Sequence, residues 1–213
     1  MVDGGELPSL SIDGGDWFSA TPPAAVPVPA ATMVGNLTAL SAMVTRPNIG
    51  VLTDMRVFGE ATAVEGVLYA DLLSEHDFWR SRLHPGTAVP ALRVPLDRVW
   101  VEHRLDPPAA QPAQEAPASG DLYDVWRRLS PGPDVPGARI PRPARGVSHL
   151  HGRRIIQVTP IGYAWNLRAI SEPYDLDGEI TVMCTAAEDY YSWIIDGSQP
   201  EAVPLPLYLL WCE

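Results

Sequence analysis

The chain has 213 residues, 46% of them hydrophobic and 19% charged, which is enough to bury a core as one large or two small domains. Its formal net charge of −11 disfavours nonspecific binding to nucleic acid or anionic lipid, because the field of the protein repels polyanions. All 15 basic residues are arginine, which fits a high-GC bacterial genome and excludes a Schiff-base lysine and a P-loop lysine.

Two cysteines, Cys184 and Cys212, are too few for a disulfide framework. The first residues, MVDGGELPS, lack the basic and apolar segments of a secretory signal. The longest strongly apolar run, residues 202–212, is shorter than the ~20 residues that cross a bilayer. We therefore expect a soluble, cytoplasmic protein that does not associate with a membrane.

The first predicted segment is an extended arm over residues 1–31, which are rich in proline, glycine and alanine. Apolar residues at helical spacing predict a helix over residues 32–44, and residues 49–58 predict a strand. A longer helix is expected over residues 62–83, because an apolar stripe follows a capping-box pattern at Thr62–Glu65.

Two further strands are expected within residues 88–105. The proline- and alanine-rich stretch 106–119 reads as a linker. It would separate an N-terminal α/β unit (32–105) from a C-terminal α+β unit (120–213). No internal repeat is evident.

The C-terminal unit is expected to open with a short helix (121–129), followed by a loop rich in proline, glycine and arginine. Apolar alternation and a turn near Asp177-Gly178 then predict strands at 153–159, 163–170 and 179–185, the last two forming an antiparallel hairpin. A second capping box, Thr185–Glu188, predicts a helix over 186–196, and a final strand is expected at the C-terminus.

The expected fold class is therefore α+β. It combines an N-terminal helix-strand-helix-strand unit with a C-terminal β-β-β-α-β unit that contains the antiparallel hairpin.

Charge is segregated along the chain. Between Arg127 and Arg154 lie seven arginines and one acid, whereas nine acids and no basic residue follow Ser171. An arginine-rich loop in so acidic a chain is suited to a negative partner: the chain's own acidic half, an acidic protein or a phosphorylated ligand. No aromatic residue lies between 130 and 154, which makes nucleic acid an unlikely ligand. The arginines expected to interact are Arg139, Arg142, Arg145, Arg153 and Arg154.

The two histidines His149 and His151 carry the sharpest chemical signal. On a strand their rings would share one face, as half of a zinc site or as an acid–base pair with an acidic partner such as Glu188 or Asp189. No third ligand follows at a fixed offset and no nucleophile motif is present, so we expect neither a metal nor a cofactor.

The aromatic residues Tyr190, Tyr191 and Trp193, on the predicted helix 186–196 beside acidic residues, are typical of an interface anchor. We therefore expect a non-enzymatic protein–protein interaction module of accessory, assembly or immunity type, whose partner has a basic surface. Two alternatives stay open. The chain could be a hydrolase or transferase that uses His149 and His151, or it could bind a phosphate or nucleotide ligand through the arginine-rich loop.

Overall fold

A computed structural model describes residues 17–33, 35–46, 50–105 and 136–213. The chain divides into two compact units, an N-terminal unit (Ala24–Arg139) and a C-terminal unit (Met1–Pro23 with Ile140–Glu213). Among the described residues each unit contains one antiparallel sheet of seven strands and one helix, so the protein is mostly β and broadly consistent with the α+β expectation. Within the same residues, no helix has the length and apolar character needed to cross a membrane.

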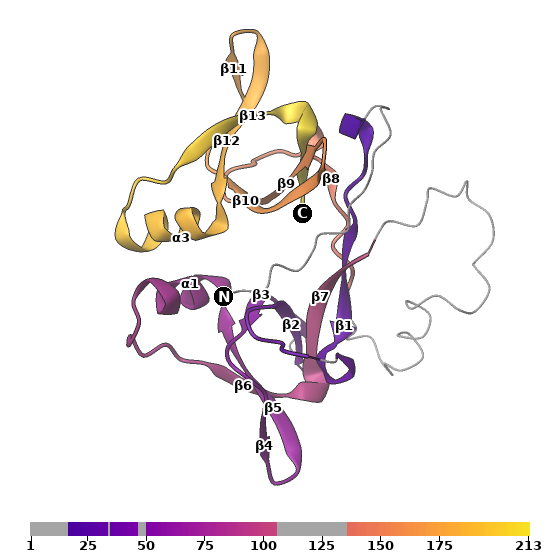
Figure 1. Ribbon diagram of the computed structural model, residues 1–213, viewed down its shortest axis with the longest axis vertical. Coiled ribbons are helices and arrows are strands. Elements are labelled where there is room, and N and C mark those ends of the chain that lie inside the picture. Colours follow the sequence, from indigo (N-terminus) through magenta and orange to yellow (C-terminus); the bar gives the residue numbers. More distant parts are fainter. Residues whose placement is uncertain (1–16, 34, 47–49, 106–135) are drawn as a thin grey trace, which may run out of the picture. The chain divides into compact units, whose positions relative to one another are not determined.

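The N-terminal unit begins with an edge strand, and its described helix follows the long strand of a hairpin (Figure 1). Its sheet has the order β1-β7-β2-β3-β5-β4, and β6 also pairs with β5. Its elements are β1 (Ala24–Pro29), the 3-10 turn η2 (Ala30–Thr32), β2 (Ser41–Arg46), β3 (Gly50–Val57), β4 (Thr62–Val64), β5 (Val67–Ser74), α1 (Glu75–Leu83), β6 (Leu92–Pro95), η3 (Leu96–Arg98) and β7 (Val99–Leu105).

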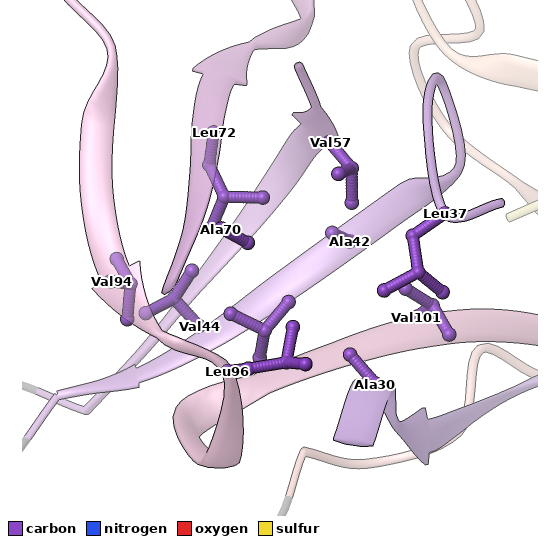
Figure 2. Packing of buried hydrophobic residues seen from close by; sticks show 11 residues of the cluster. Ala30, Leu37, Ala42, Val44, Val57, Ala70, Leu72, Val94, Leu96 and Val101 are labelled. Carbon is purple, nitrogen blue, oxygen red and sulfur yellow. The ribbon is translucent and has the colours of Figure 1, made fainter. Parts of the chain in front are cut away.

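Aliphatic side chains from most strands of the N-terminal unit meet in one core. Figure 2 shows Val44 of β2, Leu72 of β5, Val94 of β6 and Val101 of β7 pointing into the same interior, closed on one side by Ala30 of η2. Three of these core side chains, Leu72, Val99 and Val101, have no exposed surface. Each is worth about 1.5–3 kcal/mol relative to exposure to water, so this layer supports the sheet.

The C-terminal unit is built around β9–β10 and carries the N-terminal turn η1 (Trp17–Ser19), which packs on β9. The Tyr163 hydroxyl donates a hydrogen bond to the Thr21 carbonyl at 3.0 Å, which fixes this segment further. The other elements are β8 (Arg142–Pro143), η4 (Ala144–Gly146), β9 (Arg154–Thr159), β10 (Gly162–Ala169), β11 (Tyr174–Leu176), β12 (Glu179–Ala186), α3 (Ala187–Asp196), β13 (Ala202–Pro206), η5 (Leu207–Leu209) and β14 (Leu210–Cys212).

The two units repeat the same fold. The C-terminal sheet has the order β8-β14-β9-β10-β12-β11, with β13 on β12, and each strand occupies the place of its counterpart in the N-terminal sheet. In both units a helix follows the long hairpin strand, and a 3-10 turn joins the last two strands. The expectation that the chain has no internal repeat is therefore wrong.

Equivalent positions also share residue types. Arg56 and Arg168 are paired in register with the strand that precedes each helix, opposite Leu73 and Thr185. The segments PLDRVWV (95–101) and PLYLLWC (206–212) supply the same turn and strand. Both hairpin turns use an acidic residue and a glycine with positive φ, Glu65-Gly66 and Asp177-Gly178.

Two predicted helices of the N-terminal unit are wrong. Residues 41–46 form strand β2, and residues 62–74 form the hairpin β4–β5, so only the last nine residues of the predicted helix 62–83 are helical, as α1. The helix begins at Ser74, whose hydroxyl accepts a hydrogen bond from the Asp77 amide at 3.1 Å. The expected helix-strand-helix-strand order thus fails, because short apolar runs suit a strand as well as a helix.

The expected strands 153–159, 163–170 and 179–185 and the helix 186–196 agree with β9, β10, β12 and α3 within one or two residues. The unit nevertheless holds more strands than the β-β-β-α-β pattern. Thr185 does not cap α3, because its hydroxyl donates to the Glu201 carbonyl at 2.6 Å instead.

Residues 24–29 of the expected arm 1–31 belong to the N-terminal sheet as β1. The predicted linker 106–119 and the predicted helix 121–129 lie outside the described residues.

Candidate functional site

The aromatic residues predicted as interface anchors surround a buried arginine. Arg168 of β10 is 8% exposed, and its guanidinium carbon lies 5.8 and 5.5 Å from the ring centroids of Tyr190 and Tyr191. Its Nη1 donates to the Gly152 carbonyl at 2.9 Å, and its Nη2 donates to the Tyr191 hydroxyl at 3.2 Å. These contacts attach α3 to the sheet through hydrogen bonds and cation–π attraction.

The N-terminal unit contains the same arrangement. Arg56 donates from Nη1 to the Ala39 carbonyl at 3.0 Å and from Nη2 to Glu75 Oε1 at 2.9 Å. Its guanidinium carbon lies 5.3 Å from the ring centroid of Phe78 and 5.5 Å from that of Trp79. Because both units carry the cluster at equivalent positions, its shared role is to hold the helix on the sheet.

Beyond this cluster, the outward part of α3 carries two apolar side chains and one acidic side chain. Trp193 is 36% exposed and Ile194 is 48% exposed, and the side chain of Glu188 is also exposed. Of the predicted anchors, Trp193 is therefore the one that faces outward most, whereas Tyr190 and Tyr191 are half-buried.

His149 and His151 do not lie on a strand, so the condition under which their rings would share one face is not met. Both lie in the turn between η4 and β9, and His149 has a positive φ of 60° and a side chain that is 90% exposed. The carboxylate that approaches His149 is that of Glu172, at 3.9 Å, and His151 packs against the edge of Trp193, with ring centroids 6.3 Å apart.

Within the described part of the chain, no hydrogen bond or ion pair joins either histidine to Glu188 or Asp189. Nor do the described residues bring together three His, Cys, Asp or Glu side chains that could hold a metal ion. Among the described residues, neither histidine is therefore paired with Glu188 or Asp189.

Both cysteines are buried. Burial raises the pKa of Cys184 to about 12. It also raises the pKa of Cys212, although Arg153 and Arg142 act in the opposite direction. Both thiols are therefore protonated at neutral pH and poor nucleophiles.

Three of the five candidate arginines serve the fold. Arg139 donates from Nε to Glu102 Oε1 at 2.8 Å and pairs through Nη2 with Asp54 at 3.2 Å, inside the N-terminal unit. Arg153 donates from Nε to the His149 carbonyl at 2.8 Å. Arg154 lies on β9 with its side chain half-buried.

The other two arginines, Arg142 of β8 and Arg145 of η4, are exposed. No side chain or carbonyl within the described ranges forms a hydrogen bond or an ion pair with either guanidinium group. Arg145 therefore remains available to a partner, whereas Arg142 is opposite Cys212 in the ladder and lowers the pKa of that thiol.

Arg145 lines two adjoining clefts of about 350 and 450 Å³. Both clefts also share Leu207 and Tyr208 of η5. The first cleft is completed by Gly178, Glu179 and Ile180 of the β11–β12 hairpin, and the second chiefly by Phe18, Pro143, Leu210 and Trp211. We call the two clefts together the η5 groove.

Large apolar side chains of the η5 groove face solvent. Tyr208 is 55% exposed, Ile180 is 46% exposed and Phe18 is 44% exposed. Sequence reasoning assigned the final apolar run to a strand and so missed Tyr208, which η5 turns outward. For the wall of the second cleft that contains Phe18, the isolated aromatic pair Trp17-Phe18 was the only signal in the sequence.

No protein-family model, curated protein or solved structure matches the chain.

Proposed function

We propose that the chain is a non-enzymatic interaction protein that binds a partner protein through the η5 groove. One observation carries the proposal: exposed aromatic and aliphatic side chains line a cleft next to Arg145, whose guanidinium group has no partner among the described residues. Aromatic side chains and arginine are the residues that most often dominate binding energy at protein interfaces.

The outer part of α3 supports a second contact surface. Trp193 and Ile194 are exposed there beside the acidic Glu188. An apolar anchor with an acidic rim suits a partner that has a basic surface, because the rim speeds encounter while the anchor supplies affinity.

The enzymatic alternative has less support. His149 and His151 are exposed, and neither Glu188 nor Asp189 contacts them within the described residues. The carboxylate that approaches His149 is that of Glu172, and at 3.9 Å it lies beyond hydrogen-bond distance.

The test is affinity capture on immobilised full-length protein, with the captured partner then purified for direct binding measurements. We expect Tyr208→Ser to weaken binding of that partner by tenfold or more, since truncating an aromatic anchor costs about 2 kcal/mol. The matched control is Phe58→Ser, which removes an aromatic side chain that is 43% exposed in the N-terminal unit. This control should bind as well as the unmodified protein.

Trp193→Ser distinguishes the two surfaces. If Trp193→Ser abolishes binding and Tyr208→Ser does not, the contact lies on α3 and the groove proposal is wrong. If neither Tyr208→Ser nor Trp193→Ser changes the binding of any captured protein, the proposed interaction function is wrong. Melting temperatures of all variants show whether each remains folded.

A further inference from the structure

Resting on the proposed function, we infer that the η5 groove binds an extended acidic segment of a partner protein. This segment alternates apolar side chains with carboxylates, and its acidic end lies against Arg145.

Comparison of the two units distinguishes the groove residues that the shared fold needs from those that it does not need. Several residues that shape the groove have counterparts of the same type in the N-terminal unit, because both folds need the same turns and strand. These pairs are Pro29 and Pro143, Gly66 and Gly178, Leu96 and Leu207, and Trp100 and Trp211.

The polar and aromatic side chains of the groove differ between the units. Arg145 corresponds to Ala31, and Tyr208 corresponds to the exposed Asp97. The N-terminal unit thus has no cation in this place and carries an acid where the C-terminal unit has an aromatic ring. Since the same fold forms without them, Arg145 and Tyr208 are not required by the fold.

The charge of the site favours carboxylates. Arg145 lines both clefts, is exposed, and has no hydrogen-bond or ion-pair partner among the described residues, in a chain whose net charge is −11. A guanidinium group binds a carboxylate through two parallel hydrogen bonds. At the hairpin end the cleft is lined by Glu179, so the ligand's other end is neutral or basic there.

The form of the groove favours an extended segment over a small anion. The two clefts share Arg145, Leu207 and Tyr208, and their other lining residues lie on the β11–β12 hairpin in one case and mainly on η1 and β14 in the other. Alternating side chains of one extended segment can enter both clefts. A lone phosphate would meet one guanidinium group within the clefts, that of Arg145, among mainly apolar walls.

The experiment measures fluorescence anisotropy of labelled twelve-residue peptides with the full-length protein. One peptide alternates leucine and valine with glutamate, and its match has glutamine in place of every glutamate. We expect the acidic peptide to bind about tenfold more tightly, as one or two charge-assisted hydrogen bonds provide. Added salt should reduce this preference.

Variants then assign the preference to residues. Arg145→Gln should make the two peptides bind equally, while Tyr208→Ser should weaken both. Arg98→Gln is the matched control, because Arg98 is an exposed arginine on η3 of the N-terminal unit. It should leave the preference unchanged.

Equal binding of the two peptides by the unmodified protein overturns the inference, as does an Arg98→Gln effect equal to that of the groove variant. Displacement of the acidic peptide by millimolar inorganic phosphate also overturns it, in favour of a small-anion site. If neither peptide binds while the captured partner still depends on Tyr208, the proposed function stands and the acidic-segment inference fails.

Discussion

Two buried arginines hold the helices on their sheets, but each uses a different acceptor on the helix. Arg56 pairs with Glu75, whose side chain is 4% exposed, whereas Arg168 donates to the neutral Tyr191 hydroxyl. Breaking a buried ion pair costs more than breaking a neutral hydrogen bond, because a charge stays behind in a poorly solvated place.

We therefore expect Arg56→Met to lower the free energy of unfolding by about 3 kcal/mol, and Arg168→Met to lower it by about 2 kcal/mol. Urea denaturation of the two variants measures both values. Adding Glu75→Gln to Arg56→Met should recover part of the loss, since the buried charge is then gone. A double variant that is less stable than Arg56→Met contradicts this account.

A buried thiol on β12 makes stability depend on alkaline pH. The pKa of Cys184 is raised to about 12 by burial, whereas a thiol in an unfolded chain titrates near pH 8.5. The unfolded state loses this proton first as the pH rises. The thiol's contribution to stability is thus fully present below about pH 8.5 and is lost progressively as the pH approaches 12.

Cys184→Val removes this titration and nearly keeps the side-chain volume. The unfolding free energy of the variant minus that of the unmodified protein should therefore increase as the pH rises from about 8.5 to 11. Urea titrations at several pH values give the difference directly. A difference that does not change with pH would show that the thiol is not buried as described.

At the scale of elements, one hairpin turn was predicted from sequence and its twin was not. The Asp177-Gly178 pair is a recognised two-residue hairpin turn, and β12 was predicted on that basis. The arm before the turn was predicted as residues 163–170, whereas the turn joins β12 to the short strand β11, and β10 pairs with the later part of β12. The equivalent Glu65-Gly66 was overlooked, because glutamate seldom adopts positive φ and its spacing from Thr62 imitates a capping box. The repeat shared by the two units would have resolved the ambiguity.

The unfavourable backbone conformation of Glu65 leads to a prediction about stability. Glu65 has φ 51° in the turn, a conformation that asparagine tolerates far better than glutamate. Glu65→Asn should raise the free energy of unfolding by about 0.5–1 kcal/mol, as measured by urea denaturation. Asp177→Asn is the control at the equivalent position and should change stability little, since aspartate already suits the turn. Equal gains at both sites would contradict this explanation.

The candidate site was predictable only in part. The sequence identified the arginine-rich loop, but not which arginines were already engaged. Arg139 is neutralised by Glu102 and Asp54, which lie far away in the sequence and come close only through the sheet. Tyr208 sits in an apolar run, where no periodic pattern reveals that a 3-10 turn exposes one side chain of the run.

At the scale of the whole molecule, two copies of one topology are joined in an asymmetric way. The N-terminal unit is continuous in sequence, whereas the C-terminal unit combines Met1–Pro23 with Ile140–Glu213. The sheet and the main core of the N-terminal unit both come from its own residues. A unit of this kind contains what it needs to fold alone.

We expect a fragment of residues 24–139 to give a cooperative urea transition followed by circular dichroism. A fragment of residues 140–213 lacks η1, which packs on β9, and should be less stable than the same fragment with residues 1–23 fused to it. If the fragment 24–139 shows no cooperative transition, the units depend on each other for folding.

Pairs of prolines on the edge strands affect the tendency of the protein to aggregate at high concentration. The Ala25 amide of β1 donates to the Arg139 carbonyl at 3.0 Å, on the side away from β7, so the alternate positions Pro27 and Pro29 face that same side of the strand. Proline has no amide hydrogen and so cannot donate a hydrogen bond at these positions. A second pair, Pro141 and Pro143, occurs at β8. A foreign strand approaching either edge finds few donors to align with, which is a protection against aggregation by edge-to-edge pairing.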